Sequence, residues 1–166
     1  MALFGSSRDI SMFRHINKEL INDIISQEID YYQLALKETD LNVYGEAPAG
    51  KTYFPAVRIA CLISRDDQTW TVDDQFGPNV TQTIQLQFFR DILTDANLVP
   101  IVGDIVNWNG HYWELDSIIE NQLFAGKDPD YNKTVGTEFG SSISILCGAH
   151  YTKITQVQIE NARGGV

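Results

Sequence analysis

The pair Asn109-Gly110 limits the possible folds of this chain more than any other feature. A type I′ turn needs positive φ at both central residues, and Asn-Gly between two short alternating runs is the strongest local signal for it. We therefore expect a tight hairpin over about 102–119, with Gly103-Asp104 as the turn that starts its first strand. The facing pairs, outward from the turn, are Trp108 with His111, Asn107 with Tyr112, Val106 with Trp113 and Asp104 with Leu115.

Alternation along the two strands predicts which face of the hairpin is buried, because strand side chains point to opposite faces with a period of two. The face expected in the core holds Val106, Trp108, His111, Trp113 and Leu115. The other face, expected to be half exposed, holds Ile105, Asn107, Tyr112 and Glu114. A hairpin of this kind builds a small β-barrel or sandwich and performs no chemistry itself.

Near the N-terminus, apolar residues recur at helical spacing and predict an amphipathic helix over about 11–26. The helix should pack its apolar stripe against the core. A terminal helix is also the element that a ring-forming protein most easily offers to a neighbour, so a contact role stays open. The stripe comprises Phe13, Ile16, Leu20, Ile21, Ile24 and Ile25.

Alternating runs predict a β core over about 29–119, with long strands at 54–64 and 80–92, a loop at 73–79 and a short turn or helix at 91–100. Residues 121–141 show no periodicity and predict an extended loop, and the final strands are expected within about 142–160. We therefore predict a single, mainly β domain over residues 1–166. It should be a small barrel or sandwich with an N-terminal helix and a long loop excursion before the last strands.

Composition argues against several classes of function. A net charge of −10 is unfavourable for gripping DNA, which needs clustered Lys and Arg. No apolar run approaches the roughly 20 residues needed to span a bilayer, and no leader opens the chain, which favours a protein kept in a cytosol. Cys61 and Cys147 lie in apolar runs and are expected as small core residues, although a disulfide between strands is an alternative.

The sequence predicts neither an enzyme nor a metal or cofactor site. His15, His111 and His150 are far apart and lack paired-ligand spacing, and no nucleophile elbow or Gly-rich phosphate loop occurs. The segment 128–139 imitates the start of an EF-hand loop. It has Lys133 where that loop needs Gly and Phe139 where it needs Glu, so a calcium site is not expected.

The hairpin starts with Gly-Asp, alternates apolar residues, turns tightly and exits through an aromatic and an acidic-apolar pair. This pattern resembles the hairpin of neck, or head-closure (stopper), proteins of T-even-like contractile-tailed bacteriophages. Upstream, residues 21–25, 28–32 and 40–46 follow the order of segments in that family, and 125–131 fits the ordered loop after its hairpin. The resemblance covers roughly residues 15–131.

The resemblance implies a structural virion protein, assembled in the host bacterial cytoplasm, that closes the DNA-filled head and connects it to the tail. Such proteins form a ring, expected here as a homohexamer, between a portal-bound adaptor protein and a tail terminator protein. DNA passes through without specific binding, and no membrane is involved. The alternatives are a tail terminator or baseplate component, or, from another class, a small-ligand or carbohydrate-binding β-barrel.

Two groups of residues follow as candidates for function. Apolar residues on the helix and on the long loop are candidate contacts to neighbours: Phe13, Ile16, Leu123, Phe124, Tyr131 and Phe139. Acidic residues on the turns that flank one β segment are candidates to line the channel, where they would repel DNA: Asp66, Asp67, Asp73 and Asp74.

Overall fold

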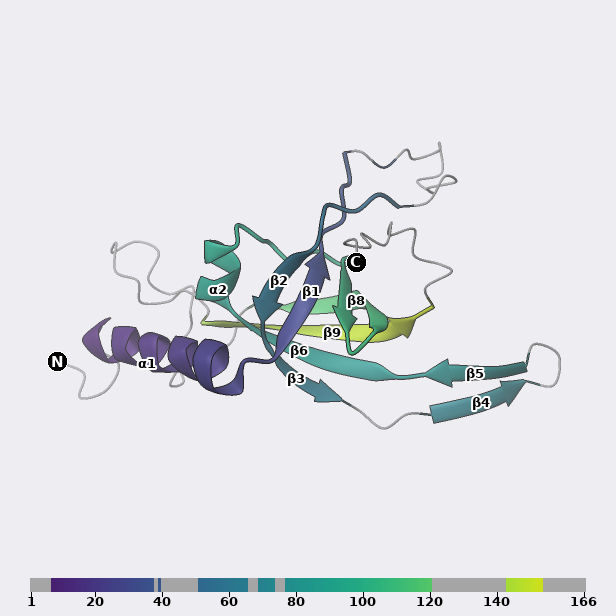
Figure 1. Ribbon diagram of the computed structural model, residues 1–166, viewed down its shortest axis with the longest axis horizontal. Helices are drawn as coiled ribbons and strands as arrows, with labels where there is room; N and C mark the ends of the chain where they lie inside the picture. The colour runs from purple at the N-terminus through teal and green to yellow at the C-terminus, as the bar shows by residue number, and fades with distance from the viewer. Residues whose placement is uncertain are drawn as a thin grey trace, which may run out of the picture.

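The computed structural model describes residues 7–37, 39, 51–65, 69–73, 77–120 and 143–153. It is mainly β, as predicted, and has an N-terminal helix (Figure 1). One antiparallel sheet has the strand order β2-β1-β7-β8-β9-β6-β3. Its strands are β1 (Glu28–Tyr32), β2 (Val57–Ala60), β3 (Leu62–Arg65), β6 (Thr83–Phe89), β7 (Ile105–Trp108), β8 (His111–Ile119) and β9 (Ser144–Thr152).

The sheet is open, so the expectation of a closed barrel or a two-sheet sandwich is corrected. Its two edge strands, β2 and β3, are consecutive in the chain and are separated by Cys61. The predicted long strand over 54–64 therefore divides at this residue. Its first part pairs with β1 and its second with β6, while the Cys61 N–H donates to the Gln27 carbonyl at 3.0 Å. The chain thus passes directly from one edge strand, β2, to the other edge strand, β3, and these two strands do not pair with each other.

The hairpin β7–β8 has the predicted register, from Trp108 opposite His111 to Ile105 opposite Glu114. Asn109 and Gly110 both have positive φ, 52° and 77°, as a type I′ turn requires. Val106, Trp113 and Leu115 are buried in the main core, which confirms most of the predicted inner face.

Two details of the hairpin prediction are wrong. His111 lies at the exposed end of the ladder, beside the turn, with its ring edge against Tyr151 rather than in the core. On the face expected to be half exposed, Ile105 and Tyr112 are buried and form a second, smaller cluster with Tyr32 and Tyr53. This second cluster forms because the segment after β1 runs back to pair Leu34 with Tyr53 and covers that side of the hairpin.

Strand β6 alternates as its sequence predicts, with Ile84, Leu86 and Phe88 buried between exposed polar residues. It is shorter than the predicted run over 80–92, because the helix α2 (Arg90–Asp95) begins immediately after Phe89. Within the range 142–160, where more than one final strand is expected, the described residues form one continuous strand, β9, as far as Thr152. Strand β9 pairs with β6 on one side and β8 on the other. This pairing keeps its backbone extended where the sequence suggests a turn.

A second ribbon, β4 (Thr69–Asp73) with β5 (Gly77–Thr81), continues outward from β3 and β6. Figure 1 shows it as an arm that projects from the body at the end opposite the N-terminal helix. The loop predicted at 73–79 is thus partly strand. The arm forms because β3 and β6 are paired antiparallel. The strands between them in the chain, β4 and β5, continue this antiparallel pairing outward.

Candidate interaction surface

The N-terminal helix is α1 (Ser7–Glu19), and it continues as a π-helical turn, η1 (Leu20–Ile25). It therefore begins earlier than the predicted residue 11. Ser26, with a φ of 48°, ends it and donates its backbone N–H to the Ile21 carbonyl. The chain then enters β1 almost at once, which holds the helix beside the sheet.

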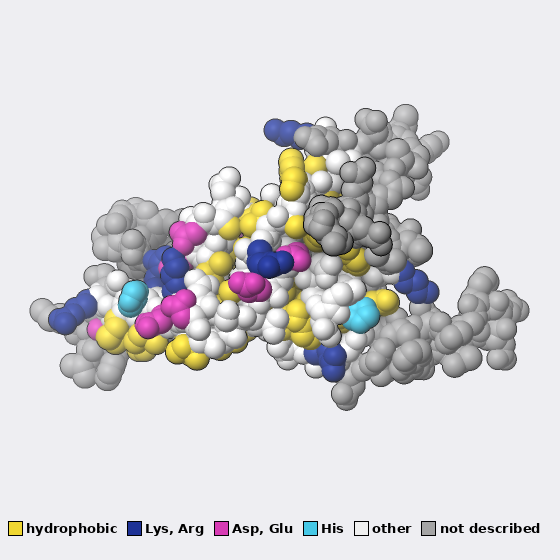
Figure 2. All heavy atoms as spheres, in the orientation of Figure 1, with side chains coloured by type: hydrophobic (Ala, Val, Ile, Leu, Met, Phe, Trp, Pro, Cys, Tyr) yellow, Lys and Arg dark blue, Asp and Glu magenta, His cyan; other side chains and the backbone are white. Residues whose placement is uncertain are grey.

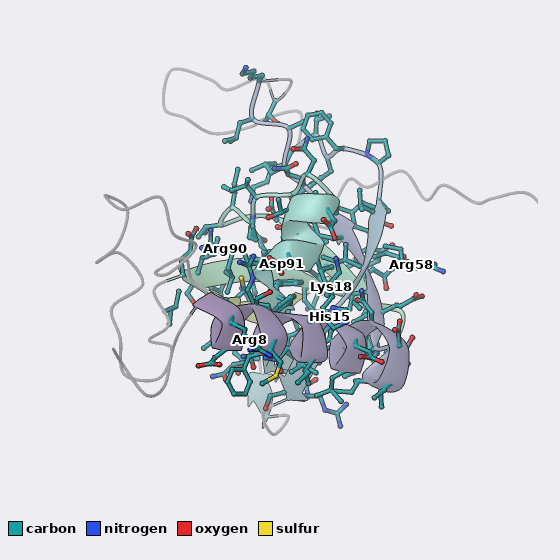
Figure 3. The ribbon with its side chains drawn as sticks, turned by 90° about the vertical axis from the view of Figure 1, so that its left-hand side faces the viewer. Arg8, His15, Lys18, Arg58, Arg90 and Asp91 are labelled. Carbon is teal, nitrogen blue, oxygen red and sulfur yellow. The ribbon has the colours of Figure 1, made fainter. Side chains whose placement is uncertain are left out.

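The helix packs against the body through its charged side. Arg14 forms an ion pair with Asp91, in which Nε lies 3.1 Å from Oδ2, and Lys18 pairs with Asp95 at 2.5 Å. Both cations and both carboxylates are four residues apart, so one turn of α1 matches one turn of α2. Figure 3 shows Lys18 and Asp91 where the two helices meet. The hydrogen bond that the Lys18 ammonium donates to Asp95 raises the pKa of Lys18 above its ordinary value.

A polar hollow between the two helices confirms which side of α1 faces the body. It is lined by Ser11, Arg14, His15, Lys18 and Asp91. The apolar stripe lies on other sides of the helix. Of its members only Ile21 is buried, at 7% exposure, and it joins the main core.

The rest of the apolar stripe faces outward, so the expectation that it packs on the core is wrong. Ile16 is 49% exposed and Ile24 is 71% exposed. Figure 2 shows hydrophobic side chains gathered along the lower edge of the α1 end of the molecule. We call this surface the outer stripe; it consists of Met12, Phe13, Ile16, Leu20, Ile24 and Ile25.

The two contact candidates in the described helix, Phe13 and Ile16, both belong to the outer stripe, and their role as contacts stays a prediction. The other four, Leu123, Phe124, Tyr131 and Phe139, lie outside the described residues, as do Asp66, Asp67 and Asp74. Asp73 is the last residue of β4, at the far end of the arm. In the sequence, the pair Asp66-Asp67 precedes β4, and the pair Asp73-Asp74 stands at its end.

The orientation of α1 was not predicted, although the sequence contains a signal for it. Arg14 and Lys18 repeat at a spacing of four, and so do Asp91 and Asp95 in the segment expected as a turn or helix. Two matched pairs of opposite charge on two short helices favour one mutual orientation. That orientation turns the apolar residues of α1 away from the body.

A buried carboxylate lies under the hairpin, at Asp104, where the sequence predicts a simple turn. Its side chain accepts hydrogen bonds from the Tyr31 hydroxyl, from the Leu34 N–H at 2.7 Å and from the Ile101 N–H at 2.8 Å. Burial raises the pKa of Asp104, and these donors oppose the rise. The residue is completely buried and joins β1 to the segment before β7, so its role is structural.

The remaining reactive side chains do not gather into a site. Within the described ranges, no three His, Cys, Asp or Glu residues are placed to hold a metal ion. His150 pairs with Asp116 at the surface. Cys61 and Cys147 are buried free thiols, as predicted, and burial raises the pKa of each to about 12. Such thiols are unreactive at neutral pH.

No helix among the described residues is long and apolar enough to cross a membrane. No protein-family model matches the chain, and no curated protein matches it significantly.

Proposed function

We propose that the chain is a structural subunit of a bacteriophage neck, where a ring of copies closes the DNA-filled head and connects it to the tail. The observation that carries the proposal is the orientation of α1, which binds the body through its ion pairs and leaves the outer stripe exposed. Contiguous exposed apolar residues of this kind mark protein-binding surfaces. The choice of a phage neck as the assembly rests on the resemblance of the hairpin and its upstream segments to head-closure proteins.

The shape of the molecule supports an assembly role. A helix at one end and a β arm at the other both extend from the sheet (Figure 1), so the chain can reach two neighbours at once. The rigid element between them is a sheet in which strand β9 is paired on both sides. A subunit that transmits contact from one neighbour to the next needs such a rigid centre.

The charge of the chain supports passage of DNA rather than its binding. With 22 acidic and 12 basic residues, the protein repels phosphates over distances of about a Debye length, roughly 8 Å at physiological salt. A duplex moving through a ring of such subunits would not adhere to its wall. In this proposed role no residue carries out a chemical reaction.

Electron microscopy of the intact particle, with this protein labelled, tests the proposal. We expect one ring of copies at the junction of head and tail. A location at the distal end of the tail would support the baseplate alternative, and a ring directly on the tail tube, below another closure protein, would support the tail terminator. Absence of the protein from the particle would contradict all three.

A variant experiment tests the part played by the outer stripe. Phage that carry Ile16→Asp should fail to join heads to tails, so separate heads and tails should accumulate. The reason is that burying the new charge in an apolar contact would require its desolvation. The matched control is Ser11→Asp, five residues earlier in α1 and on the side of the polar hollow, which should assemble normally. Normal assembly of both variants would remove the outer stripe from the proposal.

A further inference from the structure

We propose that the free chain forms a two-fold dimer, in which the outer stripe of one copy packs antiparallel against the outer stripe of a second copy. This contact goes beyond the neck function proposed above and does not depend on it. Three observations identify a second copy as the occupant of the stripe. They are the spacing of its apolar side chains, the charges along its border and the place of α1 in the molecule.

The apolar side chains of the stripe include a straight row with a centre. The row consists of Met12, Ile16, Leu20 and Ile24, which repeat at a spacing of four and are between 38% and 71% exposed. Residues four apart form a ridge on a helix, and such ridges pack into the grooves of another helix. Met12 and Leu20 are equally distant from Ile16 in the sequence. A two-fold axis at Ile16 therefore places Met12 of each copy beside Leu20 of the other.

The border of this row carries opposite charges at its two ends. Arg8 stands four residues before Met12, at the N-terminal end of the row. Glu19 and Asp23 stand near its C-terminal end, on the adjacent row of the helix. All three charged side chains are exposed, and no ion pair among the described residues involves them. Figure 3 shows Arg8 on the lower side of α1, whereas Lys18 lies above it, toward α2.

These charges match those of a second copy when the two helices run in opposite directions. Antiparallel packing about Ile16 brings Arg8 of one copy near Asp23 of the other, and the two-fold axis repeats this ion pair. Parallel packing brings Arg8 against Arg8 and Asp23 against Asp23, and such like-charge contacts oppose association. The charges therefore select both the partner, a second copy of this chain, and its direction.

The same border disfavours a membrane surface as the occupant of the stripe. A helix that lies on a membrane is rich in Lys and Arg on its polar face, because these residues are attracted to anionic lipids. Here the charged border has one Arg and two carboxylates, and the whole chain has a net charge of −10. An anionic surface would repel it.

The place of α1 leaves room for a second copy. Figure 1 shows the helix at one end of the molecule, beside the sheet rather than between other elements. Its ion pairs with α2 fix the direction of the stripe before a partner arrives, which lowers the entropic cost of association. A two-fold contact is isologous and closes with two copies. The dimer is therefore a state of the free protein, distinct from the contacts that repeat around a ring.

Disulfide trapping of the full chain tests the orientation. Met12→Cys and Leu20→Cys chains are mixed in equal amounts and oxidised in a glutathione buffer. The antiparallel contact should give mainly the mixed dimer, because it places these two positions side by side. The matched control, Lys37→Cys, is exposed and outside α1, and it should not link to Leu20→Cys above background. The native cysteines are completely buried and should not compete.

A charge exchange tests the partner, with the dissociation constant of the dimer measured by sedimentation equilibrium. Arg8→Glu should weaken the dimer by about tenfold, because it replaces two ion pairs by two repulsive contacts. Adding Asp23→Arg to the same chain should restore most of the affinity, because both pairs form again with their charges reversed. The control Lys37→Glu makes the same change of charge at an exposed residue outside α1 and should leave the dissociation constant unchanged.

Several results would overturn the proposal. One is a wild-type chain that stays monomeric at about millimolar concentration, the weak end of specific association. If that monomer also floats with phosphatidylglycerol vesicles, the occupant of the stripe is a membrane surface. Others are mainly like dimers in the disulfide trapping, an unchanged dissociation constant for Arg8→Glu, or no recovery in the double variant. None of these contradicts the proposed neck function, because microscopy locates the ring in the particle independently.

Discussion

The hairpin β7–β8 and the helix α1 both have strongly periodic apolar residues, but the hairpin buries them and the helix exposes them. Trp113 and Leu115 are almost fully buried, whereas most of the helical stripe is exposed. The sequence predicts both apolar periods equally well. The two elements differ in what determines the direction of each side chain.

A strand in the middle of a sheet has little freedom to rotate. Strand β7 is bonded to β1 and β8, and β8 is bonded to β7 and β9, so backbone ladders fix both faces. A helix satisfies its hydrogen bonds internally and can roll about its axis. In α1 the roll is set by Arg14 and Lys18, which pair with α2. Apolar periodicity therefore predicts burial reliably only where the backbone is held on both sides.

The largest effect should come from truncation of the hairpin core. Trp113→Ala should lower the free energy of unfolding by about 3–5 kcal/mol, because it leaves a cavity among packed residues. Trp113→Phe is the matched control and should lose clearly less, since Trp113 Nε1 is buried without a hydrogen-bond partner among the described residues. Denaturant melts measure both. A wild-type melt for Trp113→Ala would refute the assignment of the inner face.

Removal of the buried carboxylate should have the next largest effect. Asp104→Ala should lose about 1–3 kcal/mol, because the Tyr31 hydroxyl and two backbone N–H groups remain buried without an acceptor.

The pH dependence of this effect follows from burial, which raises the pKa of Asp104 above its ordinary value of 3.8. Its contribution is fully present below that value and decreases as the pH rises through the raised pKa. Denaturant melts from acid to neutral pH should show the gap between wild type and Asp104→Ala narrowing as the pH rises. A gap that widens with pH would contradict the direction of the shift.

A change in the hairpin turn should have a smaller effect. Gly110→Val should destabilise the fold by about 1–2 kcal/mol, because a β-branched residue is strained at a φ of 77°. No atom would clash with the added Cβ, so the loss comes from the backbone alone. Gly110→Asn, which tolerates positive φ, should retain most of the stability. Equal melts for the Val and Asn variants would show that the turn is not type I′.

The ion pairs that orient α1 should contribute little to stability. A double-mutant cycle on Arg14→Ala and Asp91→Ala should give a coupling free energy of about 0.2–1 kcal/mol, as for other solvent-accessible pairs. It is measured from urea melts of the two single variants and the double variant. A coupling of zero would mean that another contact orients the helix.

The smallest effect on stability should come from the outer stripe. Ile16→Ser should change the free energy of unfolding by no more than about 0.5 kcal/mol, because the side chain is already half exposed. The same substitution should reduce association, measured by native mass spectrometry over a range of concentrations. A loss of stability as large as that of Trp113→Ala would show that the stripe is core and would remove the contrast with the hairpin.

The amino-acid sequence alone determined the hairpin, its register and turn, the alternation of β6 and the mainly β class, because these features depend on local backbone geometry and a period of two. Tertiary structure decided the division of the chain at Cys61, the extension of the ladder into an arm and the second cluster around Tyr112. It also decided which side of α1 faces outward. These features depend on which distant segments pack together, and local periodicity carries no information about a helix's partner.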